Sequence, residues 1–236
     1  MQPKYLVLFD IDGTLLHSGG CGRAATRLAV HDVFGTTGAL DQVDFAGMTD
    51  WGILHAALEP TGIARHTIES QLPHYMDVVA EHLAAIIDDF PVRPCAGAPE
   101  VVTSLRDNPS ALLGLVTGNM ASLVPIKLQA AEYDTADFKI GAYGSEGWQR
   151  PMLPPLALER ARTYSGVDLL AEHTVIIGDT PGDITCAASI GARTIAVATG
   201  PFSMEQLSAY QPDHVFETLA NEQAVLAAIL KNGHLE

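Results

Sequence analysis

The stretch LVLFDIDGTL, residues 6–15, decides the fold, because an apolar strand runs directly into two acidic residues. In an open parallel sheet, ligands bind beyond the carboxyl ends of the strands, so this pattern places Asp10 and Asp12 where chemistry is expected. Residues two apart on an extended segment point to the same side, and Gly13 allows a sharp turn after them. Taken alone, the stretch also fits a strand that ends in an ordinary turn, since Asp and Gly are common turn residues.

Short apolar runs rich in β-branched residues alternate with longer helical patterns along most of the chain. Central strands of a parallel sheet are buried on both faces and therefore have continuous apolar sequences. The alternation predicts an α/β protein with a Rossmann-like parallel sheet and helices on both faces. The predicted strands are 5–9, 111–116, 174–177 and 194–197, with 215–216 at an edge, and the predicted helices are 122–131, 155–164, 184–190 and 219–230.

The segment after the first strand has a different pattern. From Cys21 to Phe90 there is no convincing strand, and helical patterns cover 24–34, 51–58 and 69–87. The small residues at 18–20 and the proline-containing stretch 91–94 are typical of linkers. We therefore expect an inserted all-α cap domain at residues 18–91, and a core domain made of residues 1–17 and 92–236.

Two later strand ends also carry polar groups suited to phosphate or metal chemistry. Thr117, Gly118 and Asn119 end one strand and precede a helix, where a hydroxyl and free backbone amides can hold phosphate. In GDTPGD, residues 178–183, an apolar strand again delivers acids, and Asp179 and Asp183 are four residues apart, close enough to meet on a helical turn. For each site taken singly, a helix N-cap is the alternative explanation.

The composition limits the classes of partner. Asp and Glu number 28 against 13 Lys and Arg, a formal net charge of −15, and the lysines form no cluster: Lys4, Lys127, Lys139 and Lys231. Because nucleic-acid backbones are bound through Lys and Arg, we expect no nucleic-acid partner and no anionic membrane. The three cysteines lack a CxxC pair, and no apolar run is long enough to span a membrane. We therefore expect a cytoplasmic protein without disulfides or zinc; the oligomeric state is left open.

Together these segments resemble the haloacid dehalogenase superfamily, and within it the phosphatases with a helical cap (subclass I). The family's DxDGT motif matches residues 10–14, its strand-ending Ser or Thr matches Thr117, and its GDxxxD motif matches 178–183. The family also places a Lys, sometimes an Arg, before a proline and ahead of a helix. Arg150 is our candidate for that cation, because the nearest lysine, Lys139, lies in a stretch that favours a short strand.

The resemblance implies that Asp10 is the nucleophile and forms an aspartyl-phosphate, while Asp12 protonates the leaving oxygen and then activates water. It also implies a bound Mg²⁺, held by Asp10, by the backbone carbonyl of Asp12 and by Asp179. Asp183 would assist from a neighbouring position or through water. Oxygen ligands with retained waters are what Mg²⁺ prefers.

The resemblance further assigns residues to the substrate. Thr117 and Arg150 would hold the phosphoryl oxygens, with Gly118 and Asn119 beside them. Caps of this kind close over the site and carry substrate selectivity, and Arg23 is our candidate for a substrate contact from the cap. We expect a small phosphorylated metabolite as the substrate, phosphoglycolate-like or a sugar phosphate.

The sequence argues against two other functions and leaves two open. A phosphonoacetaldehyde-type hydrolase needs a cap lysine, but no lysine occurs between Lys4 and Lys127. A 2-haloacid dehalogenase lacks the second acid of DxDGT, whereas Asp12 is present here. A β-phosphoglucomutase-like phosphotransferase stays open, although those enzymes typically have valine in place of Thr14. A catalytically silent phosphate-binding regulatory module also stays open, since function does not follow from fold.

Overall fold

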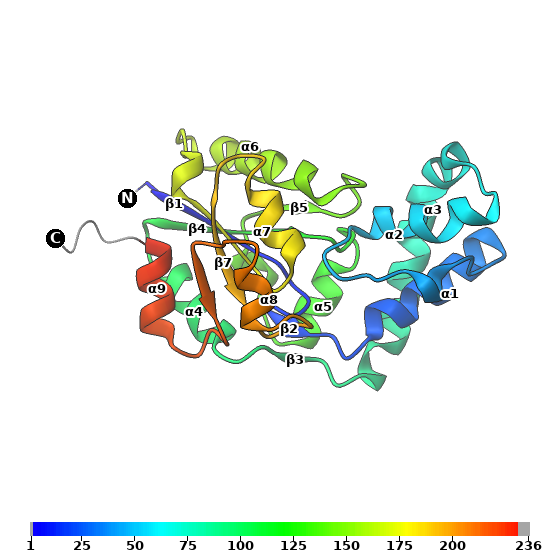
Figure 1. Ribbon diagram of the computed structural model, residues 1–236, viewed down its shortest axis with the longest axis horizontal. Coiled ribbons are helices and arrows are strands. Elements are labelled where there is room, and N and C mark those ends of the chain that lie inside the picture. The colour runs from blue at the N-terminus through cyan, green and yellow to red at the C-terminus, as the bar shows by residue number, and fades with distance from the viewer. Residues whose placement is uncertain (1, 231–236) are drawn as a thin grey trace.

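The computed structural model describes residues 2–230 and contains a six-stranded parallel sheet (Figure 1). Its strands lie in the order β5-β4-β1-β6-β7-β8. Their bounds are β1 Tyr5–Phe9, β4 Ala111–Thr117, β5 Ile140–Tyr143, β6 Thr174–Gly178, β7 Arg193–Val197 and β8 His214–Phe216. Because β1 lies between β4 and β6, the three strands that carry the predicted motifs end side by side at one edge of the sheet.

Helices cover both faces of the sheet. One face, to which Val7 and Phe9 point, is covered by α4 Ala98–Arg106, α5 Val124–Ala130 and α9 Glu222–Leu230. The other face, with Leu6 and Leu8, is covered by α6 Leu153–Ser165 and α7 Pro181–Ala187, and the short α8 Met204–Ser208 packs beside β7 and β8. Within residues 2–230, none of the helices is long and apolar enough to cross a membrane.

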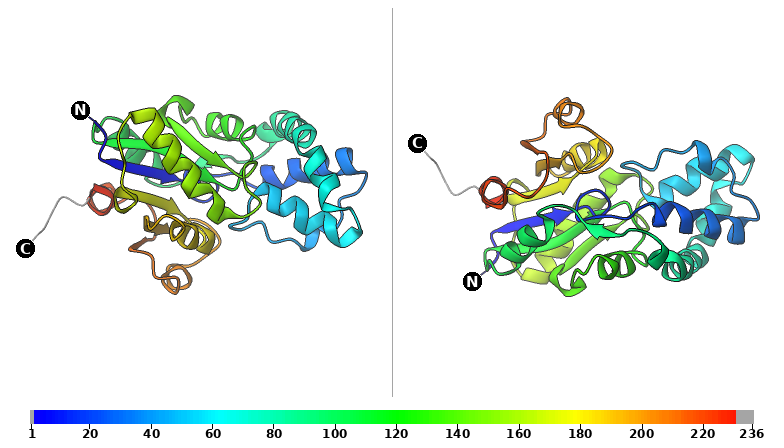
Figure 2. Two further views of the ribbon diagram at one scale, coloured as in Figure 1. Left: turned by 90° about the horizontal axis from the view of Figure 1, so that it is seen from above. Right: turned by 90° about the horizontal axis from the view of Figure 1, so that it is seen from below.

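The chain between β2 Leu16–His17 and β3 Arg93–Pro94 forms the helical insert, with α1 Cys21–Phe34, α2 Asp50–Leu58 and α3 Arg65–Ile86. The insert projects beyond the carboxyl ends of the strands, on the side away from both termini (Figures 1 and 2). It has a hydrophobic core of its own, which Met120 and Leu123 of the β4–α5 connection join. β2 and β3 pair antiparallel and so tie together the two connections between the insert and the rest of the chain.

The predicted fold class is confirmed: a parallel α/β sheet, helices on both faces and a helical insert after the first strand. The described chain also contains single 3₁₀ turns at Leu40–Gln42, Glu59–Thr61, Ile87–Asp89, Thr135–Asp137, Arg150–Met152 and Ala171–His173. Four short elements, α4, α8, β2 and β3, were not predicted. None is longer than nine residues, which leaves little room for a periodic pattern.

Two predicted elements were misplaced along the chain. The helix predicted at 184–190 begins at Pro181 and ends at Ala187, because Thr180 and Asp183 form a capping box that starts it earlier. The short strand expected around Lys139 begins only at Ile140. Lys231 lies outside the described residues.

Candidate active site

Three carboxylates converge at the carboxyl edge of the sheet. Asp10 follows β1, and Asp179 and Asp183 follow β6 and open α7. All three side chains are buried, and one oxygen from each lies within 4.8 Å of the others. The strand order explains the convergence, since β1 and β6 are neighbours and pair Phe9 with Ile177. Buried carboxylates this close repel one another unless a cation lies between them. Carboxylate oxygens are the ligands that Mg²⁺ and Ca²⁺ prefer, so the three residues have the donor atoms of a metal site.

Residues of the first motif hold Asp179 in place. Thr14 donates a hydrogen bond from its hydroxyl to Asp179 Oδ1 at 3.2 Å. Gly13 has a φ of 80°, in the left-handed region that favours glycine. A Cβ at Gly13 would collide with the Asp179 carboxylate. The DxDGT turn thus supplies both the backbone shape and a donor for an acid that lies far away in the sequence.

The pKa values of Asp10 and Asp179 are raised, which shows that burial and the neighbouring carboxylates disfavour their ionised forms. Burial raises the pKa of Asp10 to about 6, although Arg150 opposes the rise. Burial, and then the charges of Asp183 and Asp10, raise the pKa of Asp179 well above its ordinary value. Asp10 Oδ1 is buried, and although the Arg150 guanidinium lies 3.1 Å from it, it accepts no hydrogen bond of normal geometry from the described residues. A hard cation among the three carboxylates would satisfy this oxygen and offset the repulsion, so the residues present fit a Mg²⁺-type ion.

Arg150 lies inside this acidic group rather than on a solvated loop. It opens the 3₁₀ turn Arg150–Met152 and is 6% exposed. Its Nη2 is 3.1 Å from Asp10 Oδ1 and also pairs with Asp183 Oδ1. Lys139 lies elsewhere, with Nζ donating to the carbonyl of Ala136 at 2.5 Å on an exposed surface. Of the two cations weighed from the sequence, Arg150 is the one beside Asp10.

Asp183 is occupied by protein partners. Its Oδ2 accepts hydrogen bonds from the backbone N–H of Thr180 at 3.0 Å and from the Thr180 hydroxyl at 2.7 Å. Its Oδ1 pairs with Arg150. Because both oxygens have donors, Asp183 is better placed to orient neighbouring groups than to give a full coordination bond.

Asp12 has a separate set of partners that the sequence did not predict. Its Oδ2 accepts from Lys127 Nζ at 2.6 Å and from Asn119 Nδ2 at 2.7 Å. Asn119 Nδ2 also donates to Thr117 Oγ1 at 2.8 Å. Burial alone would raise the pKa of Asp12, but the charge of Lys127 and these hydrogen bonds outweigh it, and the pKa is lowered. The second acid of DxDGT is therefore held ionised, in contrast to Asp10.

The sequence analysis did not include Lys127 among the site residues, because its contact with Asp12 depends on which face of α5 carries it. It is 3% exposed. The apolar residues Leu123, Val124, Leu128 and Ala131 are spaced around it as on one face of a helix. A lysine in the middle of such a face is the signal that could have identified it, because buried lysines require a partner.

A cavity of about 580 Å³ lies between the sheet edge and the insert, and Asp10, Asp12, Lys127 and Arg150 all line it. The loop before α2 closes one side. Asp50 donates from its backbone N–H to the carbonyl of Gly118 at 2.7 Å, and its Oδ2 accepts from the N–H of Met120 at 2.8 Å. A side chain at Gly118 would collide with the carbonyl of Met48, so the two backbones touch across the junction.

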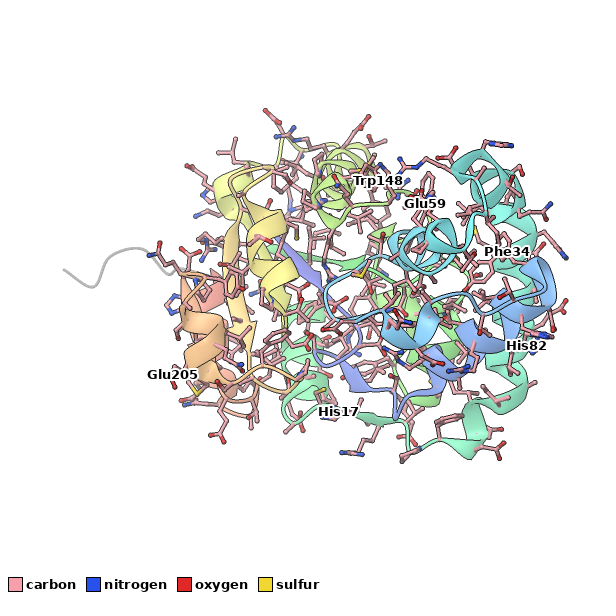
Figure 3. All side chains as sticks on the ribbon, turned by 45° about the vertical axis from the view of Figure 1, so that its right-hand side comes forward. His17, Phe34, Glu59, His82, Trp148 and Glu205 are labelled. Atoms are coloured by element: carbon pink, nitrogen blue, oxygen red, sulfur yellow. The ribbon has the colours of Figure 1, made fainter. Side chains whose placement is uncertain are left out.

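The insert contacts the rest of the chain at a second place, beside Trp148. The Arg65 guanidinium lies 5.1 Å from the centre of the Trp148 ring, and its Nε donates to Glu59 Oε1 at 3.0 Å. Figure 3 shows Trp148 and Glu59 at this part of the junction, with His17 of β2 at the opposite end of it. The insert and the core are thus in contact at two separate places.

Arg23 also lines the cavity, but its donors are partly engaged. Its Nη2 donates to the carbonyl of Val43 at 3.0 Å, and its guanidinium lies 3.9 Å from the centre of the Phe45 ring. Arg93, in β3, lines the same cavity and was not singled out in the sequence. Its charge, after burial, contributes to a lowered pKa of His17. Two arginines therefore lie around the cavity in addition to the buried cations.

The fold and site define an α/β protein with a buried group of carboxylates that can hold a metal, beneath a helical insert. A family model described as HAD-hydrolase-like matches residues 152–221. The chain is 25% identical to a phosphoglycolate phosphatase of Vibrio vulnificus (strain YJ016), over 93% of this chain and 94% of that protein. It is 23% identical to the pyrophosphatase PpaX of Bacillus mycoides (strain KBAB4), over 94% and 97%.

A solved structure agrees with these relatives in fold. A hydrolase from Pseudomonas syringae superposes with a TM-score of 0.69 at 19% identity, covering 95% of this chain and 99% of that one. The family model and the curated relatives together support a haloacid dehalogenase-like hydrolase, an enzyme of the phosphatase type. The family predicted from the sequence motifs is confirmed.

Proposed function

We propose that the protein is a Mg²⁺-dependent phosphatase that hydrolyses a small phosphomonoester through an aspartyl-phosphate on Asp10. The observation that carries the proposal is the pairing of two differently held acids in one cavity. Asp10 lies in the carboxylate group with Asp179 and Asp183, and Asp12 lies two residues on with a lysine and an amide of its own. Two acids that line one cavity but have separate sets of partners suit two separate roles, a nucleophile and an acid/base catalyst.

The two acids would act in sequence. Asp12, which is ionised in the free protein, first takes a proton from the monoanion of the bound phosphoester. A carboxylate oxygen of Asp10 then attacks phosphorus, the bond from phosphorus to the leaving oxygen breaks, and Asp12 passes its proton to that oxygen. A water molecule then attacks the phosphorus of the aspartyl-phosphate and gives a proton to Asp12. Inorganic phosphate leaves and Asp10 is restored. Mg²⁺ held by Asp10, the backbone carbonyl of Asp12 and Asp179 would neutralise charge on the transferring group.

The residues after β4 suit the phosphoryl oxygens. The Thr117 hydroxyl accepts from Asn119 Nδ2 at 2.8 Å and donates toward Asp10, where the phosphoryl group would sit. Arg150 is a buried guanidinium beside the nucleophile, and such a group can hold two phosphoryl oxygens at once. Gly118 and Asn119 line the same cavity and would contact the substrate from the edge of β4.

The substrate class follows from the size and charge of the cavity. We propose that residues 18–91 act as a cap over a core of residues 1–17 and 92–236, and that closure limits the substrate to a small molecule. Arg23 and Arg93 line the cavity and favour a second anionic group, such as the carboxylate of a phosphoglycolate-like ester. A sugar phosphate is the second candidate. The relatives named phosphoglycolate phosphatase support the first.

The test is phosphate release from a panel of small phosphomonoesters, with and without Mg²⁺, by wild type, Asp10→Asn and Asp168→Asn. Asp168 is an exposed acid with 84% of its side chain accessible, so its variant controls for loss of charge alone. We expect Mg²⁺-dependent release that Asp10→Asn abolishes and Asp168→Asn retains. An inert wild type, or an active Asp10→Asn, would contradict the proposal.

Two outcomes would favour the alternatives that the sequence left open. Transfer of phosphate to a second hydroxyl of a sugar phosphate, followed by ³¹P NMR, would indicate a mutase. Binding of phosphate without turnover of any ester would indicate a silent regulatory module.

A further inference from the structure

Lys127 joins the acid/base candidate to the phosphate-binding loop. Its Nζ donates to Asp12 Oδ2 at 2.6 Å and to Asn119 Oδ1 at 2.6 Å. Asn119 in turn donates to the same oxygen of Asp12 at 2.7 Å and to Thr117 Oγ1 at 2.8 Å. Three segments, the loop after β1, the end of β4 and the middle of α5, are therefore linked through one ammonium group.

The network of Lys127 and Asn119 holds one oxygen of Asp12, and the second oxygen lies outside it. Oδ2 has two donors, one from Lys127 and one from Asn119. Oδ1 is buried and accepts no hydrogen bond of normal geometry from the described residues. Two donors on one oxygen, attached to two different elements, fix the plane of a carboxylate and hence the direction of its second oxygen. Asp12 lines the same cavity as Asp10.

Lys127 is itself held by the fold. Its helix packs on the sheet through Val124 and Leu128, on either side of it in the sequence. Gly22, at the start of α1, approaches it so closely that a side chain there would reach Lys127 Nζ at 3.0 Å. A lysine whose side chain is fixed by packing in this way can hold the orientation of the carboxylate beside it.

We propose that Lys127 is a positioning residue that orients the Asp12 carboxylate for proton transfer to the leaving oxygen. The inference rests on the proposed function, because it takes Asp12 as the acid. Asp12 Oδ1 takes up a proton from the monoanion of the bound phosphoester. In the first step, the bond from phosphorus to the leaving oxygen breaks as the bond to Asp10 forms, and the leaving oxygen takes that proton from Asp12 Oδ1. Lys127 keeps its own protons throughout.

The role can be separated from a purely structural one by the leaving group. An alkyl phosphate leaves as an alkoxide and needs the proton, whereas 2,4-dinitrophenyl phosphate leaves as a stable phenolate and does not. The measured quantity is kcat/KM, which covers the steps up to the departure of the leaving group, so slow hydrolysis of the aspartyl-phosphate does not enter it.

The variants are Lys127→Met and Lys127→Arg, with Lys139→Met as the matched control. Lys139 donates to the backbone carbonyl of Ala136 on the surface. We expect Lys127→Met to lower kcat/KM for the alkyl ester by about 100-fold, the lower range for loss of an acid catalyst, and for the dinitrophenyl ester by less than about threefold. Lys127→Arg should recover part of the alkyl rate, and Lys139→Met should match wild type on both.

Equal losses on the two esters would overturn the proposal and indicate a structural or phosphate-binding lysine. An unchanged alkyl rate would overturn it as well. Asp12→Asn is run beside them: if it lacks the same leaving-group preference, the acid role in the proposed function fails, whatever Lys127 does. If Lys127→Met does not fold, Asn119→Ala removes the other donor to Asp12 Oδ2, and the inference requires the same preference in that variant.

Discussion

Removing the charge of Arg150 should destabilise the metal-free protein by an amount that the structure lets us estimate. Arg150 is 6% exposed and lies between Asp10 and Asp183. Arg150→Met keeps an unbranched side chain of similar length and leaves the carboxylates without their cation. Breaking a buried ion pair on one side costs about 3–5 kcal/mol. For a chain of this size, that corresponds to a fall of roughly 6–20 °C in melting temperature.

The assay is thermal unfolding in EDTA and then in a Mg²⁺ titration, at one pH near neutrality. Arg106→Met is the matched control, because Arg106 pairs with Asp107 and Asp137 while 43% of its side chain is exposed. An exposed pair contributes about 0–1 kcal/mol, so this variant should melt within a few degrees of wild type. Mg²⁺ should raise the melting temperature of Arg150→Met more than that of wild type, because the ion then meets carboxylates that no longer have an arginine beside them.

Two results would refute this reasoning. If Arg150→Met melts within about 2 °C of wild type in EDTA, less than about 1 kcal/mol separates them, and the carboxylates do not depend on that cation. If Mg²⁺ stabilises the variant less than wild type, Arg150 assists metal binding rather than competing with it, and the electrostatic account of the site is wrong.

Two further changes should act through other acids of the site. Asp179→Asn should raise the melting temperature in EDTA, because the raised pKa of Asp179 means that its ionised form is disfavoured in the folded protein. The variant should also lose the stabilisation by Mg²⁺. A variant that melts below wild type in EDTA would contradict this. Burial raises the pKa of Asp50 to about 6, so its ionisation costs stability as the pH rises from about 4 to 6, by at most about 3 kcal/mol. Asp50→Asn keeps an acceptor for Met120, so in melting experiments it should be more stable than wild type above pH 6 and equally stable below pH 4. Asp50→Ala loses the acceptor and should not show this gain. Equal stability of Asp50→Asn and wild type at both pH values would contradict the raised pKa of Asp50.

The parts of the site that lie in strand-end motifs could be predicted from the sequence. Asp10 and Asp179 each follow a continuous apolar run. A buried parallel strand delivers whatever follows it to the carboxyl edge of the sheet, whatever its neighbours are. Arg150 could be proposed only through the family resemblance, because nothing in its local sequence distinguishes a buried arginine from one on a solvated loop.

The parts that depend on packing between distant segments could not be predicted in the same way. Lys127 reaches Asp12 across 115 positions of sequence, and only the rotation of α5 on the sheet decides that it points inward. The contact of Asp50 with Gly118 and Met120 requires the insert to lie over the end of β4. The Lys127 contact and the Asp50 contacts both depend on tertiary packing, and local secondary-structure propensity carries no information about them.

The charges at the site also explain why a divalent cation suits it. The two motifs supply four acids, Asp10, Asp12, Asp179 and Asp183, and the cations in ion pairs with them are Arg150 and Lys127. With every group ionised, two negative charges remain uncompensated in a largely buried space, where their repulsion is strong. The raised pKa values of Asp10 and Asp179 are the response of the metal-free protein, which can lower that charge only by taking up protons. A bound Mg²⁺ would cancel the same two charges and keep Asp10 ionised, as its proposed role as the nucleophile requires, and it would leave Arg150 free for its proposed contact with phosphate. Asp12 needs no such help, because Lys127 already holds it in its ionised form, and the two acids of one DxDGT motif are thereby given different electrostatic partners.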